Sequence, residues 1–224
     1  MSINHWPLTE RPRERLLEKG AAHLSDAELL AVLLRNGVKG KDAVALAREL
    51  LAKTGGLRNL LSAEEKELKK EKGLGAAKIA SLIAAVEIVR RSLREEIIGK
   101  NVIRDPESVI AYLQASLRDR KREVFKVLFL NKANCIIDDL DLFEGTVDEA
   151  AIHPREVVKA ALDRNATALI LVHNHPSGRS EPSPEDREIT RKLQAACSGV
   201  SIRILDHLIV GGSRHFSFRE QGML

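Results

Sequence analysis

The stretch TALILVHNHPSGRSEPSPED, residues 167–186, joins an apolar run to the start of a helix through a polar loop. TALILVH is short and continuously apolar, which is typical of a buried strand. The loop that follows is rich in proline and contains a glycine, so the chain must leave the sheet and turn. SPED matches a helix start, with Ser183 as the N-cap, Pro184 at the first helical position and Asp186 reaching back to the cap.

Patterns of strands and helices alternate on both sides of this stretch. The expected strands are a hairpin at 123–131 (EVFKVLFLN) and 135–146 (CIIDDLDLFEGT), the run at 167–173, and one or two more at 200–212; the expected helices lie at about 108–116, 153–165 and 183–197. Strands interleaved with helices indicate an α/β domain, with a sheet flanked by helices.

The first hundred residues show helical spacing of apolar residues instead. SDAELLAVLLRNG (25–37) and KDAVALARELLAKTGG (41–56) both open with capping-type residues and close on glycine. At about 95–108 the pattern breaks into mixed charges with a glycine and a lone proline, which suggests an exposed connector. We therefore predict two domains, an all-helical one at 1–99 and an α/β one at 100–224.

Composition is that of a globular chain, with 44% hydrophobic and 30% charged residues and no apolar run that suggests a membrane span. The N-terminus resembles neither a secretory signal nor a transit peptide, so a cytoplasmic protein is expected. Cys135 and Cys197 lack a CxxC pair and are predicted to be reduced core residues. Residues 1–100 carry 19 Lys and Arg against 14 Asp and Glu. This surplus fits either a phosphate-bearing partner or an ordinary solvated surface.

Two histidines stand one residue apart at the end of the expected strand. Because side chains alternate across a strand, His173 and His175 point to the same side, which is a chelating geometry. Neutral imidazole suits zinc, and a catalytic zinc site has three protein ligands and an open position for water. Asp186 is the nearest candidate for the third ligand. The alternative is that Ser183 and Asp186 only cap the helix, although a capping carboxylate still has a second oxygen for a metal.

The composite pattern of HxH, seven residues and SxxD, filled by His173, His175, Ser183 and Asp186, resembles the zinc motif of the JAB/MPN metalloprotease domain. Four surrounding words resemble the RadC (UPF0758) branch of that group: HPRE at 153–156, HNHPSG at 173–178, PSPED at 182–186 and LDHLIVG at 205–211. The likeness covers about residues 100–224, and the N-terminal half resembles the helical region of RadC proteins. It implies a cytidine-deaminase-like mixed sheet flanked by helices.

The resemblance implies one zinc ion (Zn²⁺) bound by the two histidines and Asp186, with Ser183 beside it to stabilise an oxyanion. It also implies a general-base glutamate from an early strand, and the matching position is Glu123. Glu144 is the nearest rival, and a solvated strand-start carboxylate is the alternative for Glu123. The implied chemistry is metal-assisted hydrolysis of a peptide or isopeptide bond in a protein or peptide substrate.

Smaller signals lie around this motif. Asp206 and His207 could orient a ligand imidazole from a second layer, with plain burial at the sheet end as the alternative. His153, before Pro154, is expected to start a helix rather than bind metal. Asn174 should face away from the ligands. The letters HNH also suggest an HNH nuclease, but the three residues of those enzymes are scattered over a hairpin and a helix, so their adjacency here is interpreted as coincidence.

Residues 70–91 resemble a helix-hairpin-helix element, in which a GxG turn opens a helix whose first amides meet a DNA phosphate. Gly73 and Gly75 would form the turn, and Lys72 and Lys78 would add positive charge near the phosphate. The alternative is an ordinary glycine-rich link between packed helices. The rival function is therefore a protein that binds double-stranded DNA in repair or recombination, with a structural or nuclease-type metal site. The sequence does not indicate an oligomeric state.

Overall fold

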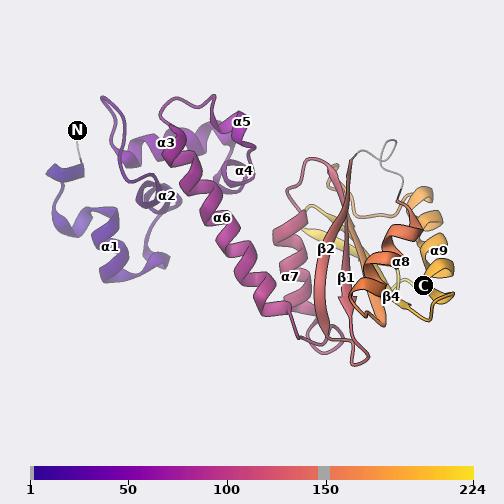
Figure 1. Ribbon diagram of the computed structural model, residues 1–224. Helices are drawn as coiled ribbons and strands as arrows, with labels where there is room; N and C mark the ends of the chain where they lie inside the picture. Colours follow the sequence, from indigo (N-terminus) through magenta and orange to yellow (C-terminus); the bar gives the residue numbers. More distant parts are fainter. Residues whose placement is uncertain (1–2, 146–151) are drawn as a thin grey trace. The chain divides into compact units, whose positions relative to one another are not determined.

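The computed structural model describes residues 3–145 and 152–224 (Figure 1). The chain divides into two compact units, Met1–Val89 and Arg90–Leu224. Within the described ranges, no helix combines the length and the apolar character that crossing a membrane requires.

The first unit is helical, as the spacing of its apolar residues predicts. Its helices are α1 (Pro12–Lys19), α2 (Asp26–Leu34), α3 (Ala43–Thr54), α4 (Leu57–Leu61), α5 (Glu65–Leu68) and the first part of α6 (Ala76–Ile97), with short 3-10 turns η1 (Ile3–His5), η2 (Leu8–Glu10) and η3 (Ala21–His23). A capping box between Ser25 and Glu28 starts α2. The Asp42 side chain caps α3, and Gly55 ends it with a left-handed φ of 77°. The apolar faces of α2 and α3 form much of the core of this unit.

The segment expected to be an exposed connector, about 95–108, is instead part of the second unit. Helix α6 continues to Ile97, which is buried in the core of that unit, and Gly99 follows it with a φ of 83°. The Gly99 N–H donates to the Ile136 carbonyl at 2.8 Å, and the Ile136 N–H donates to the Lys100 carbonyl at 3.0 Å. The boundary predicted near Gly99 therefore lies just after α6, whereas the division between the compact units falls within that helix.

The second unit is a mixed five-stranded sheet with flanking helices, which confirms the predicted fold class. Its elements are α7 (Pro106–Leu117), β1 (Glu123–Leu130), β2 (Ile136–Gly145), α8 (Pro154–Asp163), β3 (Ala168–Asn174), α9 (Pro184–Ser198), β4 (Arg203–Gly211) and β5 (Arg214–Ser217). The strand order is β2-β1-β3-β4-β5, in which β3 and β4 are parallel and the other neighbours are antiparallel. Thr146, the expected last residue of the hairpin, lies outside the described residues.

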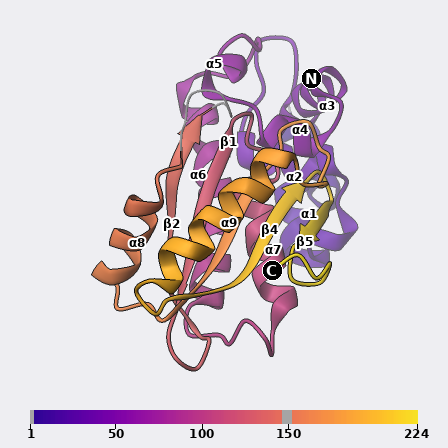
Figure 2. The same ribbon diagram turned by 90° about the vertical axis from the view of Figure 1, so that its right-hand side faces the viewer.

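Side-chain alternation along the strands produces a separate core on each face of the sheet. Val124 and Leu128 of β1 pack with α7 and the end of α6, whereas Phe125 and Val127 pack with α8 and α9. Figure 2 shows α9 lying across the near face of the sheet, with α7 behind it. His173 occupies a position in β3 that faces α9, and His175 follows directly after the strand.

A buried ion network ties the other face of the sheet to α6 and α7. Lys126 is 5% exposed, and its ammonium donates to the Asp139 carboxylate at 2.6 Å. The Tyr112 hydroxyl and the Arg94 guanidinium also donate to Asp139. Burial raises the pKa of Tyr112 to about 12, so its hydroxyl stays a donor. This network fixes the β1–β2 hairpin against the helices and so holds the strand that begins with Glu123.

Candidate metal centre

The candidate metal centre lies where β3 ends and α9 begins. His175 directly follows β3, and its backbone N–H still donates to Val210 of β4 at 3.0 Å, so the ladder carries the residue past the strand end. A capping box then starts α9: the Asp186 N–H donates to the Ser183 hydroxyl at 3.1 Å, and the Ser183 N–H donates to the Asp186 carboxylate at 2.7 Å. The cap therefore fixes the carboxylate at the helix start, as the SPED sequence predicts.

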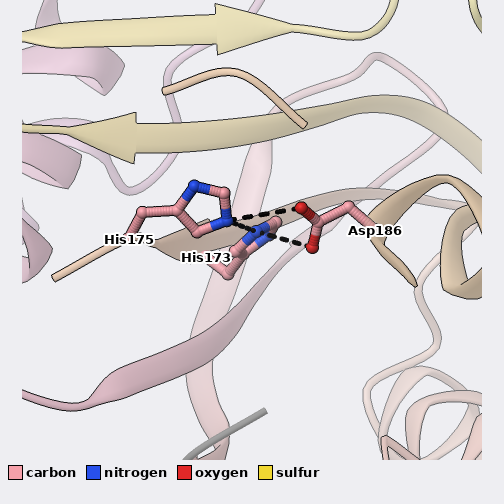
Figure 3. A group of neighbouring side chains, drawn as sticks. All are labelled: His173, His175 and Asp186. Atoms are coloured by element: carbon pink, nitrogen blue, oxygen red, sulfur yellow. Dashed lines mark hydrogen bonds and ion pairs between the residues drawn. The ribbon is translucent and has the colours of Figure 1, made fainter. Parts of the chain in front are cut away.

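The side chains of His173, His175 and Asp186 converge on one point (Figure 3). The Nε2 atom of His173 is 3.0 Å from Asp186 Oδ1, and the Nε2 atom of His175 is 3.3 Å from Oδ2. The two Nε2 atoms are 3.0 Å apart. Tetrahedral ligands about 2.1 Å from a zinc ion lie about 3.4 Å from one another, so this donor set has nearly the spacing that zinc requires.

The loop between β3 and α9 fixes the second histidine. The Nδ1 atom of His175 lies 3.0 Å from the Arg179 carbonyl, which accepts only, so the neutral ring carries its proton on Nδ1 and keeps a lone pair on Nε2 for a metal. Close packing against β4 holds Arg179: a Cβ on Gly211 would meet the Arg179 carbonyl carbon at 2.5 Å. Glycine at this position therefore lets the loop approach the strand.

The charges at this point favour a cation. Burial alone would raise the pKa of the Asp186 carboxyl, but the hydrogen bonds to His173 and His175 hold it well below its usual value. The same hydrogen bond to Asp186 raises the pKa of His175. The carboxylate is thus ionised across the physiological range and faces two imidazole nitrogens, which is the donor chemistry of a zinc site.

Glu123 lies on the same face of the sheet as these residues. Phe125 is the antiparallel partner of His173, so Glu123, two residues before Phe125, and His175, two residues after His173, project to the same side. Glu123 lines a cleft with His173 and Asp186, and burial raises the pKa of its carboxyl. Glu123, the residue predicted from the sequence, therefore lies beside the cluster.

Glu144, the rival candidate, projects to the other side of the sheet. It is the strand partner of Val124, whose side chain packs in the core on the α7 face. The Glu144 side chain is exposed. Of the two carboxylates, Glu123 therefore projects to the side of the cluster and Glu144 to the opposite side.

Two hollows adjoin the cluster. One, of about 500 Å³, has an apolar wall of Phe125, Phe143, Ile152, Pro154 and Ile189, with His153, Glu185, Glu188 and Lys192 among its polar residues. The other, of about 680 Å³, runs along the loop before α9 and includes His175, Arg179 and Ser183. Glu123 and Asp186 line both, so the cluster lies where the two hollows meet.

Asp206 and His207, the two residues expected to orient a ligand imidazole, make different contacts in the structure. The Nε2 atom of His207 lies 2.9 Å from Nδ1 of His173, so His207 is a direct neighbour of a ligand ring. The Asp206 carboxylate instead accepts from the Ser217 hydroxyl at 2.6 Å and from the Arg219 N–H at 3.0 Å, and it joins β4 to the segment after β5. Sequence reasoning missed Thr190, whose hydroxyl lies 2.6 Å from Nδ1 of His207; its position one helical turn after Asp186 was the available signal.

Asn174 faces away from the ligands, as expected, but it has a structural task. Its side-chain oxygen accepts from the Val124 N–H at 2.9 Å, and its amide donates to the carbonyls of Arg120 and Arg122. These bonds hold the backbone on both sides of Glu123. His153 occupies the N-cap position of α8 without a side-chain cap bond. Both cysteines are free thiols, and Cys197 is a core residue as predicted, but the prediction was wrong for Cys135, which is partly exposed.

The residues singled out for DNA lie in the first unit. Gly73 has a φ of 95°, and a Cβ added at Gly75, directly before α6, would meet no heavy atom within 4 Å. Lys72 is exposed. The Lys78 ammonium, however, donates to the carbonyls of Gly37 at 3.2 Å and Gly73 at 3.1 Å, so it joins two loops of the unit.

Both halves of the chain match models of known protein families. Residues 103–223 match the model of a RadC-like JAB domain, and residues 3–80 match that of the UPF0758 N-terminal region. The chain is 51% identical to a UPF0758 protein of Saccharophagus degradans and 53% identical to one of Thioalkalivibrio sulfidiphilus, over 100% of both chains in each case. A UPF0758 protein of Acidithiobacillus ferrooxidans is 53% identical over 99% of each chain.

Proposed function

Because the chain belongs to the UPF0758 family and its second unit is a RadC-like JAB domain with a His-His-Asp group that could hold a metal, we propose that it is a zinc-dependent hydrolase of peptide or isopeptide bonds. One observation carries this proposal. In the neutral form of both rings, His173 and His175 present a lone pair on Nε2, and these two nitrogens and the ionised Asp186 carboxylate lie within 3.3 Å of one another, beside a half-buried glutamate.

The donor set supports zinc as the ion. Two imidazoles and one carboxylate are the ligands of a common class of catalytic zinc sites, in which a fourth position stays open. When bound, zinc would act as a Lewis acid that makes water more acidic and polarises a carbonyl group.

Glu123 has the position and environment of a general base. In the proposed reaction its carboxylate accepts a proton from the attacking water and later donates it to the departing nitrogen. Burial raises the pKa of Glu123, which brings its affinity for the proton closer to what both transfers need at neutral pH.

Ser183 is proposed to stabilise negative charge on the substrate oxygen. Its hydroxyl lies 2.8 Å from Asp186 Oδ2, and it lines the same hollow as His175 and Glu123. In the free site this hydroxyl donates to Asp186, so in the proposed reaction it turns its proton to the substrate oxygen, where a donor lowers the energy of the oxyanion.

The apolar wall of the hollow of about 500 Å³ suggests what the substrate presents. Phe125 and Phe143 of the sheet and Ile189 of α9 line this hollow, and they would hold an aliphatic or aromatic side chain next to the scissile bond. Peptides and isopeptide-linked chains with such a residue are the proposed substrate class.

The test is hydrolysis of a peptide library and a matched set of isopeptide-linked peptides by the zinc-loaded protein, with cleavage sites identified by mass spectrometry. We expect cleavage next to apolar residues, and no cleavage by the His175→Ala variant. Equal cleavage by both proteins, or none by the zinc-loaded protein, would contradict the proposal.

A second role, binding of double-stranded DNA by the first unit, is proposed on a separate observation. Lys78 joins the turn at Gly37 to the turn at Gly73, which brings the exposed side chains of Lys39 and Lys72 onto neighbouring loops. Positive groups on paired loops can contact successive phosphates without reading the sequence. Lys78 then supports the loops rather than contacting DNA.

The matched variants are Lys72→Glu and Lys78→Met, both measured in the full-length protein by fluorescence anisotropy with a DNA duplex at two salt concentrations. Lys72→Glu should weaken binding without changing the thermal midpoint. Lys78→Met should lower the midpoint, because two loop carbonyls lose their donor. Unchanged DNA binding by Lys72→Glu would contradict this role.

A further inference from the structure

A chain of hydrogen bonds runs from one candidate ligand to another through the core. Nδ1 of His173 lies 2.9 Å from Nε2 of His207, and Nδ1 of His207 lies 2.6 Å from the Thr190 hydroxyl. The Thr190 hydroxyl in turn lies 2.5 Å from the backbone carbonyl of Asp186. This series of hydrogen bonds therefore starts at the candidate ligand His173 on β3, passes through His207 of β4 and Thr190 of α9, and ends at the backbone of the candidate ligand Asp186.

The carbonyl at the end of this chain sets the direction of every bond in it. A carbonyl only accepts, so the hydroxyl of Thr190 must donate its one proton to Asp186. The Thr190 oxygen can then only accept, and His207 must donate from Nδ1. A neutral His207 with its proton on Nδ1 has a lone pair on Nε2, which accepts from Nδ1–H of His173. The proton of His173 is thereby placed on Nδ1, and its Nε2 is left free.

Burial and ring packing prevent the His207 ring from turning over and reversing these hydrogen bonds. His207 is 0% exposed and Thr190 is 1% exposed. The His207 ring stacks on Phe218, with centroids 4.9 Å apart and planes at 18°, and meets Phe125 edge-on at 5.9 Å. A ring held between two aromatic side chains cannot turn to exchange its nitrogens without opening the core.

We propose that Thr190 and His207 are positioning residues that hold His173 in the Nδ1–H tautomer, so that its Nε2 is ready for a metal ion before any ion arrives. This inference rests on the proposed function only in assigning that nitrogen to zinc. His175 reaches the same state by a different route, through the Arg179 carbonyl. When both rings are neutral, the two Nε2 atoms thus face each other with lone pairs at 3.0 Å, an arrangement that a cation between them relieves.

These hydrogen bonds also link β3 and α9, the two elements that carry the candidate ligands. The helix turn from Asp186 to Thr190 is coupled to β3 through His207, independently of the metal. Loss of the Thr190 hydroxyl should therefore free His207 to place its proton on Nε2, which would push the proton of His173 onto its own Nε2. A protonated Nε2 cannot be a ligand.

The test compares the wild-type protein with Thr190→Val, Thr190→Ser and Thr167→Val. Thr190→Val removes the hydroxyl at nearly constant volume, and Thr190→Ser restores it. Thr167→Val is the matched control, since Thr167 also donates its hydroxyl to a backbone carbonyl, that of Leu130, away from the site. Imidazole ¹⁵N spectra of the metal-free proteins report the tautomers directly, and competition with a chromophoric chelator reports zinc affinity.

In the wild type, Thr190→Ser and Thr167→Val, both His173 and His207 should be Nδ1–H tautomers. In Thr190→Val at least one of the two rings should change, and zinc affinity should fall by about 10- to 100-fold, the usual effect of losing a partner of a ligand imidazole. A Thr190→Val protein with both wild-type tautomers and zinc affinity within about twofold of wild type would overturn the inference. If the wild type binds no zinc, the proposed function fails, and the tautomers of the metal-free proteins still decide this inference.

Discussion

Replacement of Glu123 by glutamine is the substitution that most sharply separates a catalytic carboxylate from a structural one. Glutamine has the same shape but cannot accept the proton. Since Glu123 is not among the three converging ligands, zinc content should stay at the wild-type level. A general base contributes about 10²- to 10⁴-fold to a rate, so kcat should fall by that factor, which corresponds to about 3–5 kcal/mol in the barrier.

The thermal stability of Glu123→Gln, in contrast to its activity, should not fall. Burial raises the pKa of Glu123, which means that the folded protein disfavours the charged carboxylate. The folded-state pKa is above the unfolded value, so the ionised group costs stability at neutral pH, and glutamine removes that cost. Glu123→Gln should therefore unfold at the same or a higher temperature while it loses activity.

The assay is cleavage of the best peptide from the library, with zinc measured in the same samples. The matched control is Glu144→Gln, because that carboxylate is exposed and projects to the opposite face of the sheet. It should keep full activity. A Glu123→Gln enzyme that retains more than about a tenth of kcat, or a Glu144→Gln enzyme that loses as much as Glu123→Gln, would refute the assignment.

Three further substitutions test other parts of the structure. In the metal-free protein, the lowered pKa of Asp186 stabilises the fold, and this stability is lost as pH falls through the folded-state pKa of Asp186. The raised pKa of His175 also stabilises the fold, and this stability is lost as pH rises through the folded-state pKa of His175. Asp186→Asn should thus cost more unfolding free energy near about pH 5.5 than near about pH 8.5 in urea titrations, and an equal cost would contradict the ion pair. Lys126→Met leaves Asp139, 8% exposed, without its ammonium partner and should destabilise the protein by about 3 kcal/mol in the same assay, whereas a loss below about 1 kcal/mol would show that the remaining partners suffice. Ser183→Ala should lose about 1 kcal/mol of stability as an N-cap and about 10²-fold in kcat as an oxyanion donor, with Ser183→Thr restoring both; a loss of stability alone would make it only a cap.

The parts of the site that follow from local geometry could be predicted from the sequence. Alternation along a strand places His173 and His175 on one side, and the SPED cap brings Asp186 to the start of α9, so both predictions depend on a few neighbouring residues. The helical first unit and the α/β character of the second followed from the periodicity of apolar residues for the same reason, whereas the mixed sheet was implied by the family resemblance.

The remaining features depend on tertiary contacts that no local pattern carries. Thr190 matters because β4 brings His207 to it, and Gly211 matters because a loop crosses it. Lys78 has a lysine's charge in the sequence, but packing directs its ammonium to two backbone carbonyls. The glycine, proline and charges around Gly99 looked like a linker because the sequence does not show that this backbone pairs with β2.

Elemental analysis of zinc tests the central claim most directly. The wild-type protein and His175→Ala are stripped with a chelator, reloaded with zinc, desalted and measured side by side, with circular dichroism to verify that both are folded. Convergent imidazole and carboxylate ligands predict about one zinc ion per wild-type chain and almost none in His175→Ala. Equal zinc in the two proteins, or none in either, would contradict the account.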